Sequence, residues 1–150
     1  MPTILGEKCK LSMIRTPAGM SQEDRKIYDD WKTTALKEDY DLYFDVGLGA
    51  GIPAPPETDP DIARGWFLNT QKRADLIVDT HSEWWIVELR FNASSNAIGR
   101  LLMYKKLFLQ DQIKTQPIFL ILVSDRYDPD LEGLANDNRI LYTTTVRRGT

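Results

Sequence analysis

Residues 73–90 read RADLIVDTHSEWWIVELR and carry the clearest pattern in this 150-residue chain. Residues 74–79 and 84–91 are rich in β-branched, aromatic and aliphatic side chains, which is typical of strands. The residues between them, 80–83, have the length of a hairpin loop. This stretch therefore predicts two antiparallel strands joined by a turn, with Asp79 opposite Trp84.

Charged residues interrupt the second strand near its end. Side chains alternate between the faces of a strand, and one face is expected to be core: Trp85, Val87, Leu89 and Phe91. Glu88 and Arg90 then share the other face, although burying a charge is costly unless the charge is paired or used. Counting back from the turn places Asp75 opposite Glu88, with Cβ atoms roughly 5 Å apart. Two carboxylates this close repel each other unless a cation such as Mg²⁺ lies between them.

The remaining segments predict helices and strands around this hairpin. Ser21 and Asp24 form an acidic variant of a capping box, and a helix of about four turns follows. The other expected elements are a strand over 40–46, a helix beginning at Ser94 or Ser95, a buried strand over 117–123, a short helix or turn from 128, and a last strand over 140–146. The order mixes helices and strands, which predicts an α/β fold.

Three further expectations concern the segments outside the strands. Residues 1–20 show little pattern and are expected to be an N-terminal extension of a core over about 21–146. Residues 47–60 are rich in glycine and proline and are expected to form a long loop. The helix after the hairpin is expected to pack through Ile98, Leu101 and Leu102, which turns Arg100 toward the carboxylates.

Length and composition are those of an ordinary soluble globular protein with one domain, residues 1–150. The single cysteine, Cys9, excludes an intrachain disulfide and favours a reducing setting. The start of the chain does not resemble a signal peptide, and the longest apolar run is too short to cross a bilayer, so no membrane partner is expected. Residues 64–114 carry eight basic and five acidic residues within a chain of net charge −3. This excess is either a solvated face or a patch that faces phosphates.

In order and spacing, these motifs resemble those of the PD-(D/E)XK nuclease superfamily. The resemblance implies a restriction-endonuclease-like α/β core, with a mixed central sheet flanked by helices. The quoted residues are Asp75 on one strand, Glu88-Leu89-Arg90 on the next, and a following helix with Arg100 and Tyr104. The segments 44–49 and 72–75 also resemble small nuclease-like proteins of tailed bacteriophages. The resemblance implies that Asp75 and Glu88 hold Mg²⁺, that Arg90 and Arg100 are catalytic, and that Lys72, Arg73 and Tyr104 bind a DNA substrate.

Two positions depart from the family pattern. Arg90 stands where the family has its catalytic lysine, and Arg100 stands where its helix has glutamine. Arginine keeps the positive charge, but it cannot be deprotonated and has a different reach. Arg90 therefore either clamps a phosphate or neutralises Asp75 and Glu88. Asp45 is a candidate third ligand if its strand lies beside the hairpin.

Two functions follow as expectations. The first is a DNA-processing protein in the cytoplasm of a host cell, with weak or silent Mg²⁺-dependent phosphodiesterase activity. The second is a non-catalytic structural subunit in the head, neck or tail of a phage particle, whose partners are other phage subunits. A homo-oligomer is compatible with both functions. The sequence leaves open the substrate, its polarity and the role of residues 47–60.

Overall fold

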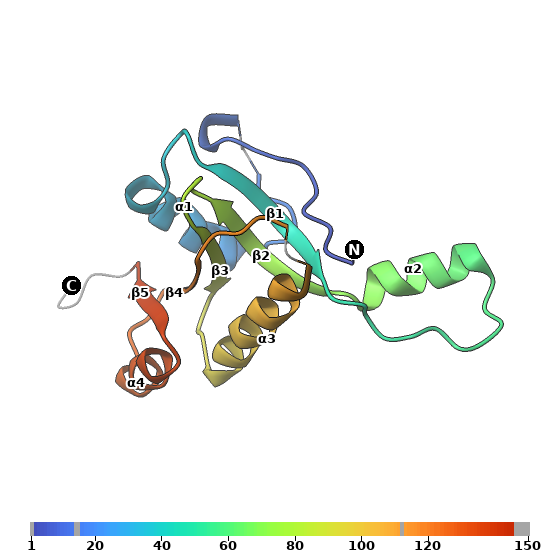
Figure 1. Ribbon diagram of the computed structural model, residues 1–150. Coiled ribbons are helices and arrows are strands. Elements are labelled where there is room, and N and C mark those ends of the chain that lie inside the picture. Colours follow the sequence, from blue (N-terminus) through green and yellow to red (C-terminus); the bar gives the residue numbers. More distant parts are fainter. Residues whose placement is uncertain (1, 14–15, 112, 146–150) are drawn as a thin grey trace.

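The predicted hairpin lies within a five-stranded mixed sheet in the computed structural model, which describes residues 2–13, 16–111 and 113–145 (Figure 1). The strands lie side by side in chain order: β1 (Asp41–Leu48), β2 (Lys72–Asp79), β3 (Trp84–Arg90), β4 (Ile118–Ser124) and β5 (Ile140–Thr144). The helices are α1 (Gln22–Ala35), α2 (Pro60–Thr70), α3 (Ser95–Asp111), α4 (Pro129–Asp137) and the short 3₁₀ helix η1 (Leu11–Met13). The first three strands are antiparallel, whereas β4 and β5 each run parallel to the preceding strand. The α/β prediction with a mixed, helix-flanked sheet is confirmed.

The hairpin has the predicted register. Asp79 lies opposite Trp84, and the pairing continues to Leu76 opposite Val87. The prediction that the second strand extends to a core-facing Phe91 is wrong, because β3 ends at Arg90 and the Phe91 side chain is exposed. The chain turns out of the sheet at Asn92, where the backbone has a φ of 55°.

Helices cover the two faces of the sheet unequally. Helix α3 connects β3 to β4, and α4 connects β4 to β5, as parallel neighbours require. Both helices pack into the core cluster on one face. Helix α1 packs on the other face through Ile27, Tyr28 and Trp31. Its predicted N-cap is confirmed, since the Ser21 hydroxyl accepts a hydrogen bond of 3.1 Å from the backbone N–H of Asp24.

Helix α3 packs on the sheet through two of the three predicted residues, Ile98 and Leu101. The buried side chains follow helical spacing: Ala97, Ile98, Leu101, Tyr104 and Phe108. Leu102 is 40% exposed, so the prediction that it packs on the sheet is wrong. The stripe runs through Leu101 and Tyr104, which turns the next position, Leu102, away from the strands.

The N-terminal residues add to one edge of the sheet. Ile4 forms an antiparallel bridge with Gly47, and Cys9 forms one with Leu42, so this segment lies alongside β1. Thr3 also donates hydrogen bonds to the Asp111 carboxylate at the end of α3. The expected extension over 1–20 is therefore integrated into the fold at its described positions.

The loop expected over 47–60 is shorter, because β1 continues to Leu48 and Pro60 begins α2, a helix that was not predicted. Asp59 caps α2 by accepting a hydrogen bond of 2.9 Å from the Asp61 N–H, and Pro60 occupies the first turn. Residues 49–70, which we call the α2 arm, project from the body of the molecule (Figure 1). None of the helices formed by the described residues has the length and apolar character needed to span a membrane.

Candidate active site

Glu88 is the most enclosed charged residue of the described chain. Its side chain lies on β3 and is 0% exposed. Neither carboxylate oxygen has a hydrogen-bond partner, although the Arg90 guanidinium lies 3.3 Å and the Arg100 guanidinium 3.7 Å from Oε2. Buried polar atoms are ordinarily hydrogen-bonded, because leaving them unpaired costs free energy. The two ion pairs therefore compensate only part of the cost of burying Glu88.

Asp75 lies beside Glu88, one residue beyond the regular pairing of β2 with β3. Its Oδ2 atom accepts a hydrogen bond of 3.0 Å from the backbone N–H of Leu89. Burial, and then the nearby charge of Glu88, raise the pKa of Asp75 to about 8. The two predicted metal ligands are thus brought together, and Asp75 holds a proton at neutral pH when no cation is present.

Asp45 does not join the two carboxylates. The backbone of β1 is left-handed at this residue, with a φ of 52°. As a result, Tyr43 and Val46 pack in the same core cluster although they are three positions apart. The Asp45 carboxylate lies 3.5 Å from Arg73. The structure therefore pairs this candidate third ligand with a cation of the chain.

Asp24, which was predicted only as part of the helix cap, belongs to the site. This buried aspartate in α1 accepts a hydrogen bond of 2.8 Å from the backbone N–H of Phe91. Its second oxygen lies 3.7 Å from the Arg90 guanidinium. The Arg90 side chain therefore lies between Glu88 and Asp24. The three carboxylates around Arg90 outweigh its partial burial and raise its pKa.

The other predicted residues line a basic hollow next to the carboxylates. Lys72, Arg73, Arg100 and Tyr104 line a cavity of about 340 Å³ together with Gly99 and Met103. Tyr104 is buried, and desolvation followed by the charges of Glu88 and Asp75 raises its pKa. Three cationic side chains thus line this hollow, and one of them, Arg100, is paired with Glu88. Such charges suit a phosphate group.

A second acidic cluster lies at the other end of β1 and β2. Asp41, Asp79 and His81 are close enough to share an ion. However, Asp41 lies 2.7 Å from Lys10, and Asp79 lies 2.7 Å from Lys114. The hydrogen bond from Lys10 lowers the pKa of Asp41, and those from Lys114 and Gln116 lower the pKa of Asp79 against its burial. Protein cations therefore already neutralise this cluster.

The geometry of the first site suits a divalent cation. A cation between Asp75 and Glu88 would give the unpaired oxygens of Glu88 a partner and would remove the proton from Asp75. The residue types also match those that bind Mg²⁺ through oxygen atoms. No family model matches the chain, and neither the curated proteins nor the solved structures yield a match.

Proposed function

We propose that this chain is a DNA-processing protein with a PD-(D/E)XK core and weak or silent Mg²⁺-dependent phosphodiesterase activity. The observation that carries the proposal is the fully buried Glu88 carboxylate, which accepts no hydrogen bond from an N–H group and lies beside a second carboxylate, with which it shares a proton when no cation is present. Natural proteins seldom retain such an arrangement without a use, because a well-packed apolar residue would be more stable there.

The arrangement of elements supports this proposal. An antiparallel hairpin carries Asp75 and Glu88, and α3 follows with Arg100 and Tyr104 before the chain returns to a parallel strand. This is the order of motifs on which the resemblance to the nuclease superfamily rests. The basic hollow next to the carboxylates supplies a place for the DNA backbone.

Each residue then has a defined role. Asp75 and Glu88 would hold Mg²⁺, which would supply a Lewis acid for a phosphodiester and for an attacking water. Arg100 and the Lys72–Arg73 pair would bind the phosphate, and the Tyr104 hydroxyl would stay protonated beside it. Arg90 supplies fixed positive charge but cannot accept a proton, so it cannot replace lysine as a base. For this reason we propose weak or silent activity.

A non-catalytic subunit of a phage particle is the second candidate, and one observation favours it. Two guanidinium groups already neutralise Glu88, and one of them also lies near Asp24. Under this reading the four charged residues form a structural ion-pair cluster without turnover, and the fold serves as a scaffold for other subunits.

Metal titration and cleavage assays test the proposal together. Calorimetric titration with Mn²⁺ and Mg²⁺ should give a single site that Glu88→Gln removes and His81→Ala leaves intact. His81→Ala is the matched control, since it disables the other cluster that could hold an ion. Linear, circular and branched DNA should each be assayed with both metals. Absence of metal binding, or binding that only His81→Ala removes, contradicts the proposed site.

A further inference from the structure

The α2 arm carries apolar side chains that the molecule itself leaves uncovered. Within the described residues, no arm side chain belongs to either core cluster, and no residue of α2 is buried. Ile62 is 64% exposed, and the exposed Trp66 lies one turn further along the same face. An 11-residue helix is marginal in water without packing partners. Covering this face would therefore stabilise the arm.

Hydrogen bonds hold the base of the arm in place. The Thr70 hydroxyl accepts a bond of 2.9 Å from the Ile52 N–H, and the Gln71 side chain donates one of 3.0 Å to the Gly49 carbonyl. Arg73 also donates a bond of 3.1 Å to the Leu68 carbonyl. The apolar face of α2 is thus presented on a fixed support, which lowers the entropic cost of docking.

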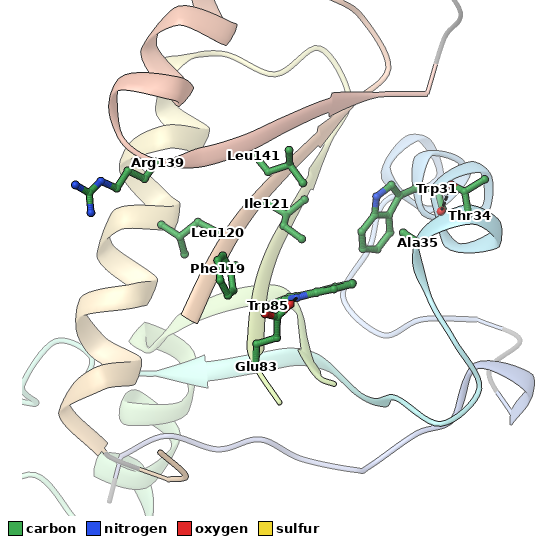
Figure 2. A pocket seen from close by; sticks show the side chains of 10 residues that line it. All are labelled: Trp31, Thr34, Ala35, Glu83, Trp85, Phe119, Leu120, Ile121, Arg139 and Leu141. Carbon is green, nitrogen blue, oxygen red and sulfur yellow. Dashed lines mark hydrogen bonds between the residues drawn. The ribbon is translucent and has the colours of Figure 1, made fainter. Parts of the chain in front are cut away.

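An apolar groove lies on the opposite edge of the sheet. Helix α1 leaves part of β4 and β5 bare, and the hollow beside it has a volume of about 440 Å³. Figure 2 shows this α1–β5 groove between Trp31 of α1 and Arg139 at its rim, with Trp85, Phe119 and Leu141 along it. Leu141 is 61% exposed. None of the ion pairs among the described residues involves Arg139.

We propose that the α2 arm of one copy of this chain docks into the α1–β5 groove of a second copy. The arm connects β1 and β2, whereas β4 and β5, which line the groove, form the opposite edge of the sheet (Figure 1), so the contact joins two molecules. Ile62 and Trp66 have the i and i+4 spacing with which a helix fills an apolar groove, and tryptophan is a frequent anchor at interfaces.

Charge selects a protein partner over nucleic acid. The arm carries Glu57, Asp59 and Asp61 against one cation, Arg64, so its net charge is −2. This charge repels phosphates. The charged residues that line the groove are one base, Arg139, and one acid, Glu83, so the acids of the arm suit the first and Arg64 of the arm suits the second. Because the two surfaces differ, the contact is head-to-tail, and a second arm and groove remain available to close a pair or a ring.

Light scattering after size exclusion tests the contact. At ~100 µM, which detects a contact with a Kd of ~10 µM, the wild type should exceed the mass of one chain. Trp66→Ala in the arm and Leu141→Glu in the groove should each give one-chain mass, 17.2 kDa. Leu102→Ala, another exposed leucine, should keep the wild-type mass. Phe119→Ser replaces Leu141→Glu if circular dichroism shows that the latter is unfolded.

Mixing the two variants distinguishes this contact from any other. The Trp66→Ala chain keeps an intact groove and the Leu141→Glu chain keeps an intact arm, so an equimolar mixture should form a species of two chains. A monomeric wild type overturns the proposal. So does an arm variant that keeps the wild-type mass, or a mixture that stays monomeric, because the arm and the groove then do not meet.

Discussion

The backbone N–H of Phe91 donates a hydrogen bond of 2.8 Å to the Asp24 carboxylate, which fastens the end of β3 to helix α1. The second oxygen of Asp24 lies 3.7 Å from the Arg90 guanidinium. Helix α1 therefore fixes both the backbone that follows the candidate active site and one of its charged side chains. A change in α1 can alter the site without touching Asp75 or Glu88.

Removing the Asp24 carboxylate should destabilise the fold. Asp24→Ala leaves the Phe91 N–H without its acceptor, which should lower the free energy of unfolding by about 1–3 kcal/mol in urea titrations. Asp24→Asn keeps an acceptor oxygen and should lose less. Glu23→Ala, an exposed acid in the same helical turn, controls for the favourable effect of negative charge at a helix start. Equal losses for Glu23→Ala and Asp24→Ala would assign the effect to helix charge.

The raised pKa of Asp75 should make stability fall with pH in metal-free buffer. The folded protein holds a proton on Asp75 up to a pH of about 8. The unfolded chain releases that proton near pH ~4. The Asp75 contribution to stability is therefore fully present at low pH and is lost as pH rises from about 4 to about 8. Urea unfolding should show the stability of wild type falling relative to that of Asp75→Asn over this range and levelling above it. A wild type that gains stability relative to Asp75→Asn as pH rises would contradict this.

Local signals explain why the hairpin and the first helix could be predicted. The short loop over 80–83 fixes the pairing of Asp79 with Trp84, and every later pair follows from that register. Ser21 likewise marks the start of α1 through a hydrogen bond that spans three residues. Information of this kind lies within a few neighbouring positions, so composition and spacing are sufficient to find it.

The features that were missed depend on distant contacts. Asp24 and Phe91 are separated by 67 positions, and no residue near Asp24 predicts the hydrogen bond between them. Helix α2 packs in neither core cluster and has only a short apolar stripe, Ile62 and Trp66, although Asp59-Pro60 is a recognisable helix start. In α3, two consecutive leucines, 101 and 102, are both compatible with an apolar stripe, so the sequence does not show which of them faces the sheet. Packing against the sheet buries Leu101.

That choice between neighbouring leucines can be measured directly. Leu101 is 0% exposed whereas Leu102 is 40% exposed. Leu101→Ala should lower the free energy of unfolding by about 2–5 kcal/mol, because it removes buried methyl groups and leaves a cavity. Leu102→Ala, the adjacent control, should change it by no more than about 0.5 kcal/mol. Comparable losses in urea titrations would mean that the outer face of α3 is covered in solution.

Replacing Arg90 by lysine should raise DNA cleavage. Arginine spreads its charge over a plane that lies near both Glu88 and Asp24, and it stays protonated. Lysine offers a compact ammonium group that can turn toward a water beside the metal and can exchange a proton. Arg90→Lys should therefore cleave DNA faster than wild type with Mg²⁺ or Mn²⁺, and adding Glu88→Ala should abolish the gain. Arg100→Lys is the matched control, since Arg100 also pairs with Glu88 but from the exposed side of the hollow. Strong wild-type cleavage that Arg90→Lys weakens would identify arginine as the working residue. No cleavage by any variant, together with no metal binding, would favour the structural subunit.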